Sequence, residues 1–140
     1  MKSIYEEDVP TNLYISLINR KHAAYLNKKL EKENLSFGLY PLLIKVHIED
    51  GISQEDLATF FQLNESTITR NLKKLEEKGF IKKNLEHRKK IITTTPMGSK
   101  TAQKIMNYDE QWDEQIRKNM TEEEFQKFKK TLHKICISLI

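Results

Sequence analysis

The chain has 140 residues, 38% hydrophobic and 31% charged, which suits one domain with a buried core, and four glycines and three prolines disfavour a β fold with many turns. Its net charge of +4 is too small to demand a polyanionic partner by itself. The single cysteine excludes an internal disulfide, and the sequence contains no run of 18 apolar residues that could span a membrane. The acidic start lacks the apolar segment of a signal peptide. We therefore expect a cytoplasmic protein without a membrane partner.

Two helices are predicted in the first third of the chain. The first covers about residues 10–30, and its apolar stripe is wider than one packing partner needs. The second covers about residues 39–49, with its apolar side chains directed inward, and ends at Gly51. The breadth of the first stripe indicates that this helix packs against more than one surface.

A pair of capped helices follows. Ser53 is a good N-cap for a short helix over residues 54–61, which begins with an acidic turn. After a tight connection, Asn64 is a good N-cap for a helix over residues 65–78, and Gly79 is placed to end it in the left-handed conformation.

The periodicity then changes from helical to β. We predict two antiparallel strands over residues 80–84 and 91–95, joined by an exposed basic loop. Thr95 as N-cap and Pro96 as first residue predict the start of another helix, which continues to about residue 120.

The last helix begins at a predicted capping box of Thr121 and Glu124. Its apolar residues recur at alternating steps of three and four, as in a helix that packs along one seam. The members of this seam are Phe125, Phe128, Leu132, Ile135 and Leu139.

Two helices joined by a short turn and followed by a β-hairpin indicate a winged helix-turn-helix, within a fold that is mainly α with a small β-hairpin wing. Positive charge is concentrated in it: residues 66–90 contain nine basic and three acidic residues, a net charge of +6, so the rest of the chain carries −2. Such a segment is typical of a phosphate-binding surface, although a solvated lysine-rich face would carry the same charge.

The helix over residues 65–78 separates apolar from polar side chains. Leu72 and Leu75 fall within about 40° of Ile68 and form the predicted buried seam with it. Hydroxyl groups and cations on the exposed side can reach base edges and phosphates. The candidate DNA-binding residues are Ser66, Thr67, Thr69, Arg70, Lys73 and Lys74 on this helix and Arg88, Lys89 and Lys90 in the loop.

Two other functions fit a winged helix: a protein-interaction module and an RNA-binding module. The first predicts an apolar exposed face on the helix over residues 65–78, where the sequence has Ser, Thr, Arg and Lys. Competition between duplex DNA, single strands and RNA for the protein would distinguish an RNA-binding module from a DNA-binding one. An ordinary amphipathic surface helix would show the same periodicity. The prediction of DNA binding therefore depends on the short preceding helix, the tight turn and the basic hairpin.

The segments "SQEDLATFFQLNESTITRNLKKLEEKGFI" and "RKKIITTTPMGSK" resemble the MarR family of winged-helix transcriptional regulators. Thr69-Arg70 matches the family's recognition helix, and residues 75–79 match its Leu-Glu-x-Lys-Gly pattern. In the wing, Glu86 takes the place of the family's aspartate and Arg88 that of its arginine, while Thr94 replaces its usual leucine.

The sequence shows no repeat or linker, so we predict a single MarR-like domain over residues 1–140, in which a winged helix-turn-helix over about residues 37–95 lies between dimerisation helices over about residues 10–33 and 96–140. The resemblance implies a homodimer. A two-fold dimer should bind a pseudo-palindromic operator, and repression is favoured over activation. The broad apolar stripes near both ends of the chain support a dimer independently. Residues 109–124 contain seven acidic and two basic residues, so we expect this part to face away from DNA.

The resemblance also implies release from DNA by a small aromatic effector. The residues that we would place near such a ligand are Arg20, His22, Tyr40, His47, Met106 and Tyr108. At any single position, core packing or ordinary exposure accounts for the residue equally well.

We predict no metal, cofactor or enzymatic activity. His133 and Cys136 have helical spacing, but a metal site needs three or four ligands. We expect Cys136 to be a packed small side chain. The sequence contains no glycine-rich phosphate loop, nucleophile motif or coherent pair of acids.

Overall fold

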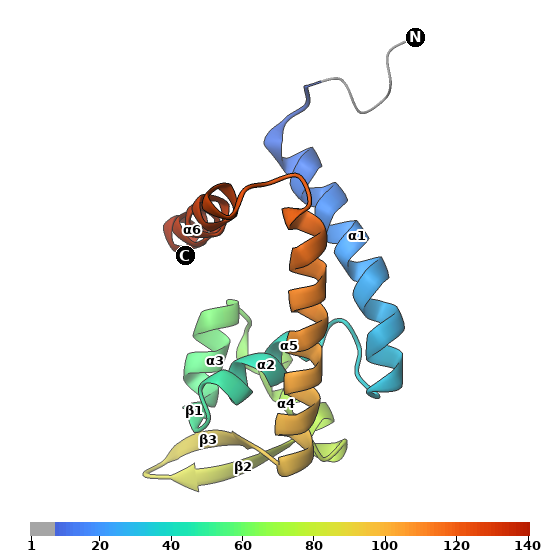
Figure 1. Ribbon diagram of the computed structural model, residues 1–140. Coiled ribbons are helices and arrows are strands. Elements are labelled where there is room, and N and C mark those ends of the chain that lie inside the picture. The colour runs from blue at the N-terminus through green and yellow to red at the C-terminus, as the bar shows by residue number, and fades with distance from the viewer. Residues whose placement is uncertain (1–7) are drawn as a thin grey trace. The chain divides into compact units, whose positions relative to one another are not determined.

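The structure is a computed structural model that describes residues 8–140. This part of the chain forms two compact units, which divide between Tyr108 and Asp109 within one helix. The single domain over residues 1–140 stays a prediction. The elements in chain order are α1 Thr11–Lys32, α2 Tyr40–Ile48, β1 Ile52–Ser53, α3 Gln54–Phe61, α4 Glu65–Glu77, β2 Ile81–Glu86, β3 Lys89–Thr94, α5 Pro96–Arg117 and α6 Glu122–Leu139 (Figure 1).

The strands of the first unit form an antiparallel sheet in the order β1-β3-β2. In β1, Ile52 pairs with Ile92, and the amide of Gly51 donates to the Ile92 carbonyl at 2.9 Å. The sequence analysis did not predict β1, because a strand of two residues is too short to show an alternating pattern. The predicted two-stranded hairpin is therefore part of a three-stranded sheet.

The hairpin turn is tighter than predicted. Glu86 pairs with Lys89, which leaves only His87 and Arg88 in the turn. Their φ angles are 49° and 68°, and a type I′ turn requires positive φ at both of these positions. The predicted strand limits at residues 84 and 91 were wrong, since β2 continues to Glu86 and β3 begins at Lys89. The turn contains no Asn-Gly or Asp-Gly pair, so its sequence carries no signal for two residues.

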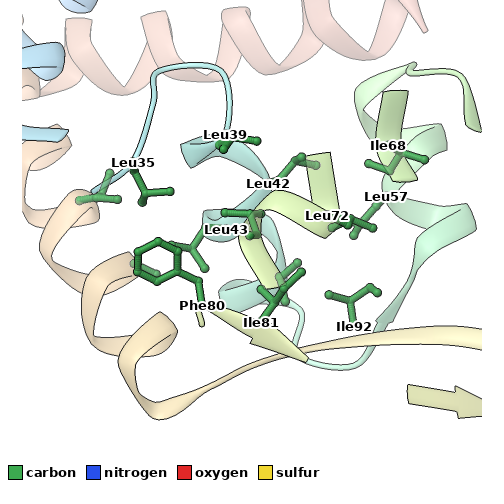
Figure 2. Packing of buried hydrophobic residues seen from close by; sticks show 14 of the residues in the cluster. Leu35, Leu39, Leu42, Leu43, Leu57, Ile68, Leu72, Phe80, Ile81 and Ile92 are labelled. Carbon is green, nitrogen blue, oxygen red and sulfur yellow. The ribbon is translucent and has the colours of Figure 1, made fainter. Parts of the chain in front are cut away.

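The core of the first unit consists mainly of leucine and isoleucine side chains from the helices and the sheet, together with Phe80 (Figure 2). On α4, Ile68, Leu72 and Leu75 are 0% exposed, which confirms the predicted buried seam. Burial of one such side chain contributes about 1.5–3 kcal/mol. These contacts hold α4 by one face, and its opposite face remains at the surface.

Side-chain caps fix the starts of α3, α4 and α6 at the predicted residues. Ser53 Oγ accepts from the amide of Asp56 at 3.0 Å, and Asn64 Oδ1 accepts from the amide of Thr67 at 2.8 Å. The capping box at the start of α6 also forms as predicted. A cap of this kind contributes about 1 kcal/mol, and the Asn64 cap sets where α4 begins.

One junction joins the end of α4 to the start of α5. Gly79 has a φ of 82°, and the Phe80 amide donates to the Leu75 carbonyl at 3.0 Å, so α4 ends in a Schellman motif. Across the junction, the Thr95 amide donates to the Phe80 carbonyl at 3.0 Å and the Thr95 hydroxyl donates to the Gly79 carbonyl at 2.6 Å. Thr95 Oγ1 also accepts from the amide of Gly98 at 3.0 Å, as the predicted N-cap of α5.

In the second unit, α6 buries Phe125 and exposes most of its predicted seam. Leu132 and Ile135 are 42% and 47% exposed, and Leu139 is 78% exposed. The prediction of a packed Cys136 was wrong for the described chain, in which this thiol is exposed. The reason is that every side chain of residues 129–140 is exposed, so nothing in the second unit covers this end of α6.

We predict that Gly98→Ala destabilises the first unit. A Cβ at this position would lie 1.9 Å from the Phe80 carbonyl oxygen, a main-chain atom that the junction holds in place. The free energy of unfolding should fall by about 1–3 kcal/mol or more. The measurement is urea unfolding at fixed protein concentration.

The matched control is Gly38→Ala, where a Cβ meets no atom within 4 Å. This variant should unfold at nearly the same urea concentration as the parent protein. Equal stability of the two variants would show that the Phe80–Gly98 contact is not the constraint described above.

Candidate nucleic-acid interface

The turn between α3 and α4 has the geometry of a helix-turn-helix. Gln62 ends α3 in the left-handed conformation with a φ of 53°, and the amide of Leu63 donates to the Ala58 carbonyl at 3.0 Å. Asn64 then caps α4, so three residues connect the two helices. Leu57 of α3 is buried in the same core as the apolar face of α4, which fixes α3 against it (Figure 2).

The exposed face of α4 contains the residues that the sequence analysis places there. Ser66, Thr69, Arg70, Lys73 and Lys74 are exposed, and Thr67, the sixth candidate, is half-buried. Within residues 8–140, the three cations of this face form no ion pair. Their charge is therefore available to a phosphate or a base edge.

Two hydroxyl groups of this face are already hydrogen-bonded. Ser66 Oγ donates to Asn64 Oδ1 at 2.9 Å, so its proton is committed to the cap. Thr69 Oγ1 accepts from Gln54 Nε2 at 3.0 Å and keeps its own proton to donate. Gln54 is 4% exposed, and the sequence analysis missed it, because a glutamine in a first helical turn looks like a solvated residue.

The wing carries Arg88 at its tip, as predicted. The hairpin of β2 and β3 projects from the first unit, at the lower left of Figure 1. Lys89 and Lys90 follow Arg88 at the start of β3 and are exposed, and so is Lys82 on β2, which the sequence analysis did not include. Glu86 and Arg88 form no ion pair within the described residues, so the tip is set by turn geometry and strand pairing.

A cleft of about 230 Å³ separates the wing tip from the starts of α3 and α4. The wing side is entirely cationic, whereas the helix side includes two carboxylates. The lining residues are Ser53, Gln54, Glu55 and Glu65 on the helix side and Arg88, Lys89 and Lys90 on the wing side. The candidate interface therefore contains acidic groups beside its basic ones.

The residues predicted to hold an effector lie in different surroundings within the first unit. The ring of Phe37 has its centroid 6.0 Å from that of His22 and 5.4 Å from that of Tyr40. Arg20 is exposed on α1, and the other two, His47 of α2 and Met106 of α5, are half-buried. A groove of about 600 Å³ on α1 is lined by none of the six predicted residues; its lining is Ala24, Tyr25, Lys28, Lys29 and Lys32.

Tyr108 belongs to a hydrogen-bonded group that joins α1 to α5. Its hydroxyl donates to Glu33 Oε1 at 3.2 Å, and its carbonyl accepts from the Tyr25 hydroxyl at 3.0 Å. Lys104 Nζ lies 3.7 Å from Glu33 Oε2. Burial, followed by the charge of Glu33, raises the pKa of the Tyr108 phenol above its ordinary value, so the phenol keeps its proton and acts as a donor.

Residues 8–140 contain neither a cluster of metal ligands nor a membrane-spanning helix. No three His, Cys, Asp or Glu side chains of this part lie close enough together to hold a metal ion. No helix in the same range is long and apolar enough to cross a membrane.

Known proteins are similar to this chain in sequence and in fold. The sequence model of the MarR family matches residues 38–86. A crystal structure of MarR is 31% identical in sequence, with 98% of this chain and 95% of that chain covered and a TM-score of 0.84. The chain belongs to the MarR family. This membership confirms the predicted winged-helix fold and makes the chain a transcriptional regulator and not an enzyme, as predicted.

Other relatives agree with this result. The HTH-type transcriptional regulator BilQ of Clostridium symbiosum (strain WAL-14163) is 29% identical over 114 residues, which cover 79% of each chain. The structure of the S. aureus MepR–DNA complex has a TM-score of 0.79, covers 94% of this chain and 97% of that chain, and is 23% identical. At that identity the second similarity establishes the fold alone.

Proposed function

We propose that the chain is a cytoplasmic repressor that binds duplex DNA as a homodimer. The observation that carries the proposal is the unpaired cationic face of α4, next to a wing with Arg88 at its tip. In this arrangement α4 enters the major groove and Arg88 reaches the adjacent minor groove. The polar character of the exposed α4 face argues against a protein-interaction module, which would present apolar side chains there.

Two exposed apolar surfaces, one in each compact unit, support the dimer. A monomer would leave both in water, whereas a two-fold partner can cover them. The surface on α1 comprises Leu13, Tyr14, Ile15, Leu17 and Ile18, and the surface at the end of the chain comprises Leu132, Ile135 and Leu139 on one side of α6. A two-fold dimer favours a pseudo-palindromic operator with half-site centres roughly 34–36 Å apart. A dimer on such a site would block polymerase without further components, which favours repression.

We expect a dimer at micromolar concentration, and we expect Leu132→Glu combined with Ile135→Glu to convert it to a monomer. Two carboxylates placed in an apolar interface would lose their hydration without gaining partners. Sedimentation velocity provides the measurement. Lys130→Glu is the control, because this exposed residue lies on the opposite side of α6 and should leave the dimer intact. A monomeric parent protein would contradict the proposed assembly.

Arg70 and Arg88 should have different effects on DNA binding. Arg70→Ala removes a guanidinium that can form two hydrogen bonds with guanine, so affinity for the operator should fall by about 1–3 kcal/mol, with relaxed sequence choice at one position per half-site. Arg88→Ala removes a contact to a narrow, negative groove, so binding to all duplexes should weaken and the salt slope should fall by about one unit per contact.

The measurement is titration of both variants against an operator, selected from genomic fragments, and a scrambled duplex at several salt concentrations. Lys118→Ala removes one exposed charge outside the proposed interface and should change neither affinity. If Arg70→Ala weakened both duplexes equally and Arg88→Ala weakened only the operator, the two roles would be reversed. Competition with single-stranded DNA and RNA tests whether the duplex is the preferred ligand.

Release by a small aromatic acid is the remaining part of the proposal. The aromatic group of His22, Phe37 and Tyr40 supplies ring contacts, and Arg20, which is exposed two residues before His22 on α1, supplies a cation. A phenolic acid should bind the free protein more tightly than the DNA-bound protein, because coupling between two sites is reciprocal. Calorimetric titration with and without operator measures this difference, and equal affinities would remove the regulatory role.

A further inference from the structure

The cleft between the wing and the helix starts places opposite charges across a solvent gap. Glu55 lies in the first turn of α3, and Glu65 is the first residue of α4. Both line the same cleft as the three wing cations, Arg88, Lys89 and Lys90. Among the described residues no ion pair joins these groups, so the carboxylates attract the wing cations through water.

Glu65 is held at this cleft by a buried side chain. Gln54 is 4% exposed, and its Nε2 donates to Glu65 Oε2 at 3.4 Å as well as to Thr69 Oγ1 at 3.0 Å. The Glu65 carboxylate can only accept, so it fixes which end of the Gln54 amide faces it. The contact restrains the Glu65 carboxylate near the helix start and the wing.

The position of the two carboxylates also has a simple structural benefit. Acidic residues in a first turn interact favourably with the helix dipole. The same helix starts, however, are where a helix-turn-helix approaches DNA, and a carboxylate there repels phosphates. Dipole stabilisation alone would not require the carboxylates to share a cleft with the wing tip.

We propose that Glu55 and Glu65 act as intramolecular counter-ions of the wing: they restrain Arg88, Lys89 and Lys90 in the free protein and compete with DNA phosphates for these cations. This inference rests on the proposed DNA-binding function. Affinity for non-operator duplex depends mainly on phosphate contacts. The competition therefore weakens binding to DNA with which α4 forms no specific base contacts. Base contacts by α4 at the operator are not subject to this competition.

The first test needs no DNA. In the Glu55→Gln/Glu65→Gln variant, the wing-tip amides should exchange with solvent about 2–5-fold faster, as expected for the loss of weak surface charge pairs. The control is Glu76→Gln, which removes an exposed charge from the other end of α4 and should leave wing exchange unchanged. Unchanged exchange in the double variant would overturn the inference, whatever the protein does with DNA.

The second test measures binding to a scrambled duplex. Each single variant, Glu55→Gln or Glu65→Gln, should raise this affinity about 3–10-fold at low salt, and the gain should fade as salt screens the charges. In an Arg88→Ala background the gain should shrink, because a wing cation has been removed. A gain of the same size in that background would indicate general repulsion of phosphates and would overturn the role of the wing.

Two further outcomes separate this inference from the function on which it rests. If Glu65→Gln lowered operator affinity without raising affinity for the scrambled duplex, Glu65 would be a base contact, since a carboxylate can accept from the cytosine amino group, and the inference would fail. If the parent protein bound no duplex at all, the proposed function would fail, and the exchange measurement would still decide whether the carboxylates restrain the wing.

Discussion

The main chain of Gly79 and Phe80 connects α4, the wing and α5. The Phe80 amide donates to the Leu75 carbonyl at the end of α4, and the carbonyls of Gly79 and Phe80 accept from Thr95, which follows β3. The next residue, Ile81, begins β2. The Phe80 carbonyl lies so close to Gly98 that no larger residue fits there without a shift. Because three elements share these few atoms, the direction in which α4 leaves the core and the direction of the wing are set together. The proposed binding of α4 and the wing to two adjacent grooves needs this fixed relation between helix and wing.

Packing and charge are separated on α4. Apolar contacts of Ile68, Leu72 and Leu75 hold the helix, and none of the basic residues takes part in them. Arg70, Lys73 and Lys74 can therefore change without loss of the core, and an interface built this way can alter its preferred DNA without refolding. The hydroxyl groups are less independent, since Ser66 supports the cap and Thr69 supports Gln54 of the preceding helix.

In the wing, strand pairing holds a turn whose backbone conformation is unfavourable by itself. His87 and Arg88 adopt positive φ although neither is glycine, a conformation that costs energy by itself. Six paired positions between β2 and β3 hold the hairpin, and β1 pairs with the other edge of β3. The sheet thus stabilises a turn that places a guanidinium at its tip, where the neighbouring carboxylates of the cleft can act on it.

Most of the helical architecture was determined by the sequence alone. The caps at Ser53, Asn64, Thr95 and Thr121 and the seam of α4 are local, because a side chain bonds an amide three residues away and apolar residues repeat with the helical period. The family motif lies in this same local pattern, which explains why the resemblance and the comparisons agree.

The tertiary structure decided what depends on contacts between distant residues. The strand β1 exists because Ile52 meets Ile92, and Gln54 contacts α4 because α3 places it against Thr69 and Glu65. Opposite charges meet in the cleft because the wing returns beside helix starts that precede it by more than 20 residues in the sequence. No periodic pattern encodes such pairings, since burial and the approach of opposite charges are properties of the folded chain, and neither exists until distant segments come together.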